Sequence, residues 1–264
     1  MILLGTSGFS YKDWVGVFYP ENTKNAEMLE FYAERFPCVE LNFTYYRMPA
    51  TRTIEGLVRK VPSDFQFCIK ANKAMTHEID REAGSNFSKK VFSDFMEALK
   101  PMTTQGFLGC ILAQFPWGFK KTASNIEHVL RLKELLADVP VVIEFRNSQW
   151  ISEETFDLLR SHDLAFCAVD EPRLRGLMPP IAETTSDLGY VRFHGRNAKK
   201  WWKHDNPQER YDYLYSEREL EEWIPRIQQI ADKTLKTYVF FNNCHSGQAA
   251  QNAQMLRAML GLEL

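Results

Sequence analysis

Short apolar runs alternate with longer amphipathic stretches along most of the chain. The runs have the length of buried β-strands, and the stretches between them repeat their apolar residues with a helical period. The expected strands are 2–6, 38–42, 65–70, 107–114, 141–146, 164–170, 190–194 and 238–243. The expected helices are 24–36, 51–60, 88–99, 124–137, 153–161, 217–232 and 247–260. Ser124 and Ser216 each precede a glutamate by three residues, which is the capping-box spacing that begins a helix.

Eight strands that alternate with helices predict parallel βα units. For 264 residues, a closed TIM-type (β/α)8 barrel fits this order best, and an open doubly wound sheet is the alternative. Residues 171–187 contain three prolines and no helical period, so we expect an irregular connection between strands six and seven. No linker or repeat interrupts the pattern, so a single domain over 1–264 is expected.

Polar residues enter the expected strands near their carboxyl ends. Residues two apart in a strand share a face, so in 141–146 the side chains of Val142, Glu144 and Arg146 point the same way. Other strands carry polar groups near the same end: Glu40, Asn42, Lys70, Gln114, Asp170, Arg192 and His194. Barrel enzymes have their active sites at this end, so the pattern predicts a shared polar site.

A purely structural network is the alternative explanation for these groups. The three acids Glu40, Glu144 and Asp170 could neutralise the three bases Lys70, Arg146 and Arg192. However, apolar residues would stabilise a barrel interior as well or better than buried ion pairs. The pattern therefore favours a ligand site over a network that serves stability alone.

Two turns at strand ends offer further candidate contacts. The turn GTSGFSYKDW (5–14) could present backbone N–H groups to an anion, or it could be a simple tight turn. The turn NNCHSG (242–247) places Asn243 and His245 where they could orient a polar substrate, or it could only cap the last helix.

A metal site is possible but not favoured. His77, His194 and His245 lie at or beyond strand ends and could join the carboxylates around a divalent cation. The neighbouring lysine and arginine side chains would oppose such a cation. We therefore expect no particular cofactor or metal.

The segment 194–206 combines basic and aromatic residues that could contact nucleic acid: Arg196, Lys199, Lys200, Trp201, Trp202 and Lys203. Bases can stack on tryptophan while cations meet phosphates, and such binding weakens steeply with salt. A solvated lid that packs on the barrel rim is the alternative. The formal net charge of −2 gives no general support to nucleic-acid binding.

Composition bears mainly on the compartment. No apolar run approaches the length of a membrane span, and the first residues lack the features of a secretory signal. The five cysteines occur singly, without a CxxC pair. We therefore expect a cytoplasmic protein without a disulfide framework.

The motifs resemble, in order, those of the YecE-like family, the domain of unknown function numbered 72. They include GTSGFSYKDWVGVFYP, VELNFTYYRMP, FQFCIKANKAMTH, LAQFPWGF, VVIEFRNSQW, YVRFHGR, YDYLYS and FFNNCHSGQAAQNA. One departure is Asn147, where the family often has histidine. The resemblance implies a TIM-type barrel but supplies no reaction, and a looser likeness to endonuclease IV and xylose isomerase barrels is fold analogy only.

The favoured hypothesis is an enzyme that acts on a phosphate-bearing or otherwise anionic substrate. Lys70, Arg146 and Arg192 would hold the anion, and Glu144 or Glu40 would act as base with His194 as acid. Hydrolase, isomerase and lyase chemistry all stay open. Further expected substrate contacts are Asn42, His77, Asp170, Arg196, Tyr213, Asn243 and His245. The alternatives are a nucleic-acid-binding or nucleic-acid-processing barrel and a non-catalytic metabolite binder.

Overall fold

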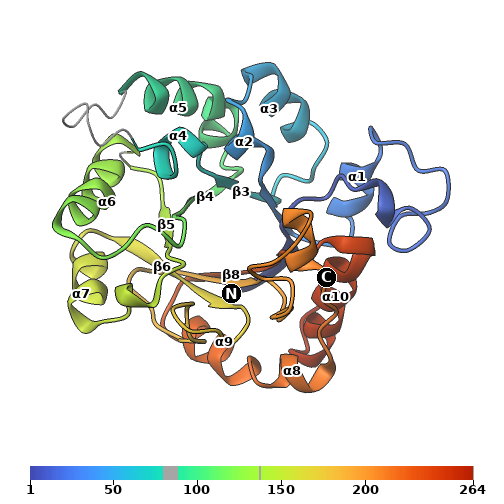
Figure 1. The fold of residues 1–264 in the computed structure, drawn as a ribbon. Coiled ribbons are helices and arrows are strands. Elements are labelled where there is room, and N and C mark those ends of the chain that lie inside the picture. Colours follow the sequence, from blue (N-terminus) through green and yellow to red (C-terminus); the bar gives the residue numbers. More distant parts are fainter. Residues whose placement is uncertain (80–88, 137, 264) are drawn as a thin grey trace.

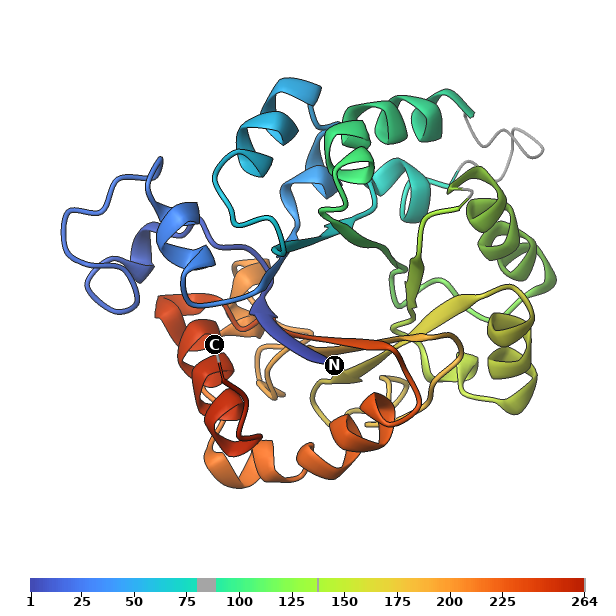
Figure 2. The ribbon, with the colours of Figure 1, turned by 180° about the vertical axis from the view of Figure 1, so that it is seen from behind.

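Eight parallel strands form one sheet that curves into a barrel in the computed structural model, which describes residues 1–79, 89–136 and 138–263. The strands are β1 (Ile2–Thr6), β2 (Cys38–Leu41), β3 (Gln66–Lys70), β4 (Leu108–Gln114), β5 (Val141–Glu144), β6 (Leu164–Asp170), β7 (Leu188–Phe193) and β8 (Lys236–Phe241). Their order in the sheet is β1-β8-β7-β6-β5-β4-β3-β2. Figure 1 shows the helices outside this ring of strands, and Figure 2 shows the same ring from behind.

The barrel is nearly closed where β1 meets β2. These strands are joined by a single parallel bridge between Ser7 and Glu40. Gly5 allows the close approach, because a Cβ at this position would lie 2.3 Å from the backbone oxygen of Cys38. The predicted (β/α)8 barrel is thus confirmed, and the open doubly wound sheet is not the architecture of this chain.

The helices alternate with the strands as the sequence pattern predicts, and two further short helices, at 43–46 and 73–76, were not predicted. They are α1 (Met28–Ala33), α2 (Phe43–Tyr46), α3 (Thr51–Val58), α4 (Lys73–Thr76), α5 (Lys89–Thr104), α6 (Ala123–Leu136), α7 (Glu153–Ser161), α8 (Glu217–Glu221), α9 (Ile224–Ala231) and α10 (Gln248–Met259). The expected first residue 88 and last residue 137 of two helices lie outside the described residues. In the described parts of the chain, no helix has the length and apolar character to cross a membrane.

The single helix predicted over 217–232 is two helices. Pro225 has no N–H to continue the hydrogen-bond ladder of α8, so α9 begins again at Ile224. Ser216 caps α8 as predicted, and its backbone N–H donates to Glu219 at 2.9 Å. The prediction for Ser124 is wrong, because α6 already begins at Ala123 and the hydroxyl of Thr122 accepts the Asn125 N–H.

Residues 171–187, all described, contain neither helix nor strand. This segment joins β6 to β7 and is held by side-chain hydrogen bonds instead. The hydroxyl of Thr185 accepts the N–H of Phe166 at 2.8 Å, and the N–H of Met178 donates to the carboxylate of Glu171 at 2.8 Å. The second of these bonds places Glu171 at the carboxyl end of the barrel.

The interior of the barrel has an aromatic part and an ionic part. Tyr190, Tyr238 and Phe240 are fully buried and pack against one another on β7 and β8. The hydroxyl of Tyr190 then donates to Glu40 at 2.7 Å, where the ionic part begins. On β7 the inward-facing residues therefore change from aromatic at Tyr190 to charged at Arg192 toward the carboxyl end of the strand.

Candidate functional site

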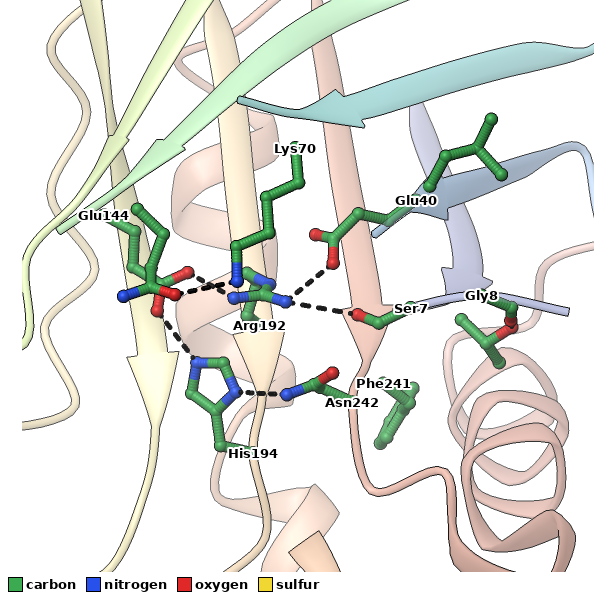
Figure 3. A network of polar contacts seen from close by, with 12 residues as sticks. Ser7, Gly8, Glu40, Lys70, Glu144, Arg192, His194, Phe241 and Asn242 are labelled. Carbon is green, nitrogen blue, oxygen red and sulfur yellow. Dashed lines mark hydrogen bonds and ion pairs between the residues drawn. The ribbon is translucent and has the colours of Figure 1, made fainter. Parts of the chain in front are cut away.

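Arg192 lies at the centre of the ionic layer. Its Nη2 donates to Glu40 at 2.6 Å and its Nη1 donates to Glu144 at 2.5 Å, so one guanidinium joins carboxylates from β2 and β5. Nη2 also lies 3.4 Å from the hydroxyl of Ser7 (Figure 3). Both carboxylates are 0% exposed and Arg192 is 1% exposed, so these charges depend on one another rather than on water.

Arg146 extends the ionic layer to a third carboxylate. Its Nε lies 2.5 Å from Glu144, and its Nη1 donates to Glu171 at 3.0 Å. Burial raises the pKa of Glu171 to about 7, although Arg146 and the Met178 N–H oppose that rise. The two guanidiniums thus form ion pairs with three carboxylates. Both terminal nitrogens of Arg192 are engaged in these pairs and are not available to a ligand.

Glu144 also contacts His194, which directly follows β7 and belongs to the same ionic layer. Burial would raise the pKa of Glu144, but Arg192 and Arg146 outweigh it and hold that pKa well below its usual value. Burial and Arg146 lower the pKa of His194, which is therefore neutral. Its Nε2 lies 3.2 Å from Glu144, and its Nδ1 lies 3.1 Å from the amide nitrogen of Asn242 (Figure 3).

Lys70 has a different environment from the two arginines. Its Nζ donates to the amide oxygen of Gln114 at 2.8 Å and lies 4.6 Å from the ring centre of Tyr45. Among the described residues, no carboxylate forms an ion pair with it. Burial, followed by the positive charge of Arg192, lowers the pKa of Lys70 to about 7. At neutral pH this amine is therefore a mixture of charged and neutral forms.

A cavity of about 670 Å³ opens above the ionic layer. Lys70, Arg146 and Arg192 line it from the barrel, and Asn42, Tyr211 and His245 line it from the loops. The 5–14 turn also contributes to the wall. Glu40, Glu144 and His194 do not line it and lie among the buried groups. The side-chain oxygen of Asn42 is buried and has no hydrogen-bond partner among the described residues.

Asp170 belongs to a separate network on the outer face of β6. Its carboxylate accepts hydrogen bonds from Tyr215 at 2.8 Å, from Trp223 at 2.7 Å and twice from Arg196 at 2.8 Å. Arg196 also pairs with Glu222 at 2.9 Å. The structure therefore does not bring Asp170 or Arg196, both expected to contact substrate, to the cavity.

Three other predicted contact residues also lie away from the cavity wall. The Tyr213 hydroxyl donates to Glu219, and the Asn243 amide donates to the backbone oxygen of Tyr213 at 2.8 Å. His77 packs edge-on against Tyr45, where burial and then the nearby Lys70 lower its pKa to about 4. Of the expected loop contacts, only Asn42 and His245 line the cavity.

The proposed nucleic-acid segment is only partly open to solvent. Trp201 is 2% exposed and packs against Tyr211, whereas Trp202 is 52% exposed and meets Trp117 edge-to-face. Lys200 pairs with Glu209 at 2.7 Å. Lys199 and Lys203 are exposed. One tryptophan of the pair is thus unavailable for stacking on a base.

The described residues contain no group of three or more histidine, cysteine, aspartate or glutamate side chains placed to hold a metal ion. His194 contacts Glu144, but the carboxylate of Glu144 already forms ion pairs with Arg192 and Arg146. His245 lies at the cavity wall and is 3.9 Å from Asp212.

Several residues of the site were not among the predicted contacts. Glu171 and Asn242 face the barrel axis, while their neighbours Asp170 and Asn243 face outward. Extending the two-residue period from Tyr238 and Phe240 would have selected Asn242. No such signal existed for Glu171, because both faces of β6 are apolar. The sequence pattern placed Gln114 at the carboxyl end of its strand but did not indicate that it accepts a hydrogen bond from Lys70.

The fold and the ionic layer define a TIM-type barrel protein with a polar cavity at the carboxyl ends of its strands. A family model described as "Protein of unknown function DUF72" matches residues 3–264, and this chain belongs to that family. The family resemblance inferred from the sequence motifs is thus confirmed.

Curated relatives and solved structures agree with this assignment. The chain is 31% identical to UPF0759 protein YunF of Bacillus subtilis over 100% of this chain and 96% of that protein. It is 26% identical to UPF0759 protein YecE of Escherichia coli over 45% of this chain and 39% of that protein. A DUF72 family protein from Thermotoga maritima is 42% identical, with 99% of each chain covered and a TM-score of 0.91. A DUF72 family protein from Enterococcus faecalis is 26% identical, with 100% of this chain and 97% of that chain covered and a TM-score of 0.90. None of these names states a reaction.

Proposed function

We propose that this protein is an enzyme that acts on a small anion-bearing substrate by proton transfer in the cavity above the ionic layer. The observation that carries the proposal is the position of Lys70, which lines the cavity without a carboxylate partner among the described residues. Its pKa of about 7 allows the same amine to accept or donate a proton at neutral pH. Substrate binding would use the cavity, and proton transfer would use Nζ.

The acid and base roles expected for Glu144 and His194 fit the geometry less well. Glu144 is 0% exposed and already contacts Arg192, Arg146 and His194. A carboxylate whose pKa is held so low is a weak base, and neither residue lines the cavity. We assign them the role of keeping the two guanidiniums in place beneath the substrate.

Arg146 is the better candidate for holding the anion. Its contacts with Glu144 and Glu171 use Nε and Nη1, so Nη2 is left for a ligand in the cavity that the residue lines. Both terminal nitrogens of Arg192, in contrast, donate to carboxylates. A substrate anion would therefore meet Arg146 and the charged form of Lys70 together, and charge-assisted bonds of this kind are strong.

Arg146→Lys is expected to weaken the binding of inorganic phosphate by about 10- to 100-fold, because lysine keeps the charge but loses the planar fork. Binding should also weaken as pH rises through about 7, where Lys70 loses its proton. Isothermal titration calorimetry measures both effects. Arg47→Gln is the matched control, because Arg47 lines the cavity but is exposed. Equal losses in the two variants, or no phosphate binding by the wild type, would contradict the proposal.

Nucleic-acid binding is the second candidate function. The exposed pair of Trp117 and Trp202 favours it, because exposed rings with lysines nearby can stack on bases. Trp202→Ala should then weaken binding of a single-stranded DNA oligonucleotide. Affinity should fall at least about 10-fold between roughly 50 and 200 mM salt. A salt-independent signal that survives Trp202→Ala would eliminate this candidate.

A cytoplasmic location is part of the same proposal. All five cysteines have free thiols, and Cys38, Cys68, Cys110 and Cys167 are buried. A chain that keeps its thiols unpaired suits a reducing compartment.

A further inference from the structure

The charged side chains at the carboxyl end of the barrel are unequally paired. Arg192 and Arg146 each contact two carboxylates within 3.0 Å. Lys70 projects into the same space, and its Nζ donates a hydrogen bond to the neutral amide of Gln114. A lysine kept for stability would be expected to pair with one of the nearby acids. Burial and the nearby Arg192 instead oppose the ammonium form of Lys70, so part of this amine is neutral at pH 7.

The placement of Nζ suits a nucleophile. Gln114 fixes one N–H of the amine, and the ring of Tyr45 lies on another side at 4.6 Å. Lys70 also lines the cavity. Arg146 lines the same cavity, and its Nη2 has no hydrogen-bond or ion-pair partner within the described ranges. An electrophilic carbon could therefore reach Nζ while an anionic group on the same molecule reaches the guanidinium.

We propose that Lys70 forms a covalent imine with the carbonyl carbon of an aldehyde or ketone that also carries a carboxylate or phosphate group. This inference rests on the proposed function and names its substrate class. An imine withdraws electrons from the neighbouring bonds of the substrate. Of the three reaction classes that the sequence left open, an imine therefore favours isomerase or lyase chemistry over hydrolase chemistry.

The step is balanced without a further reactant. The neutral amine attacks the carbonyl carbon and forms a C–N bond, while the π electrons move to oxygen, which takes a proton. The C–O bond then breaks, and both amine hydrogens leave with the oxygen as water. Amine plus carbonyl compound gives imine plus one water, with no change of oxidation state.

Reductive trapping with cyanoborohydride tests the imine. The probes are pyruvate, a ketone with a carboxylate, and pyridoxal 5′-phosphate, an aldehyde with a phosphate. Intact-protein mass spectrometry and peptide mapping at about pH 7 should find one dominant adduct on Lys70. Labelling there should be at least about 100-fold faster than at an ordinary lysine, because at pH 7 the neutral fraction of this amine is about 1,000-fold larger.

Lys236 provides a matched control. It lies at the opposite end of the barrel, at the start of β8, and its Nζ also donates to a glutamine amide oxygen, that of Gln66. Lys70→Arg and Lys70→Met should abolish the dominant adduct, whereas Lys236→Arg should leave it unchanged. Circular dichroism confirms that each variant is folded.

The possible outcomes separate the imine from the proposed function. If phosphate binds and depends on Arg146 as predicted, but neither probe labels Lys70, the imine is overturned and the proposed function stands. Labelling spread evenly over many lysines and unaffected by Lys70→Arg also overturns the imine. If Lys70 is labelled but phosphate neither binds nor competes, the reactive amine stands, whereas the anion site and the anionic group assigned to the substrate are overturned.

Discussion

Arg192→Met is expected to lower the free energy of unfolding by about 3–5 kcal/mol, because it leaves the buried Glu40 without a cationic partner among the described residues. Of its two guanidinium partners, Glu144 would keep only Arg146. Arg192 donates to Glu40 and Glu144, and both carboxylates are 0% exposed. The variant would retain both acids in the barrel interior with one fewer guanidinium. Urea denaturation at neutral pH, followed by circular dichroism, measures the loss.

A surface ion pair gives the control for this prediction. Arg131 and Glu134 lie 2.5 Å apart on α6 and are 42% and 63% exposed. Arg131→Met should change the free energy of unfolding by no more than about 0.5 kcal/mol. If Arg192→Met costs as little as Arg131→Met, the ionic layer does not hold the strands together as we describe.

Lys70→Met is expected to have the opposite effect and to stabilise the protein by about 2–4 kcal/mol below pH 7. The pKa of Lys70 is about 7 in the folded protein against an ordinary value of 10.5, so folding below pH 7 buries an unfavourable charge. Methionine removes that cost. It also removes the hydrogen bond to Gln114, which offsets about 1 kcal/mol of the gain.

The gain should depend on pH in a defined direction. Between about pH 7 and 10.5 the unfolded chain binds a proton at Lys70 that the folded chain does not, so wild-type stability rises with pH relative to Lys70→Met. The difference between the two proteins should be largest below pH 7 and should shrink toward pH 10. Denaturation curves across this range test it. A variant that is less stable than wild type at about pH 6 would show that Lys70 stabilises the fold.

The two predictions distinguish two kinds of buried cation. Removing Arg192 breaks a pair and destabilises the protein, whereas removing Lys70 relieves an unpaired charge. A residue that costs stability is commonly kept because function requires it. If both results are obtained, they will favour our proposal that Lys70, rather than either arginine, is the reactive group of the cavity.

The barrel and its ionic layer followed from sequence periodicity. The alternation of strands and helices gave the fold, and the two-residue period correctly grouped Glu40, Lys70, Glu144 and Arg192 on the inner face. These four side chains converge in Figure 3. Buried parallel strands have few alternative arrangements, so pattern and topology together locate the carboxyl-end site.

Residues beside the strand ends were harder to place. In β6 both faces are apolar, so periodicity did not reveal that Asp170 points outward to Trp223 while Glu171 points inward to Arg146. The pairing of Arg196 with Asp170 and the burial of Trp201 depend on how loops pack over the rim. Such contacts join residues far apart in the chain and have no local signal.

The proposed chemistry depends on the ionisation of Lys70 near neutral pH, which NMR can measure. Protein labelled with ¹³C at the lysine Cε is titrated, and the resonance missing from the Lys70→Arg variant is assigned to Lys70. We expect this resonance to titrate with a midpoint near 7. A midpoint in the ordinary lysine range of about 10.4 would contradict it.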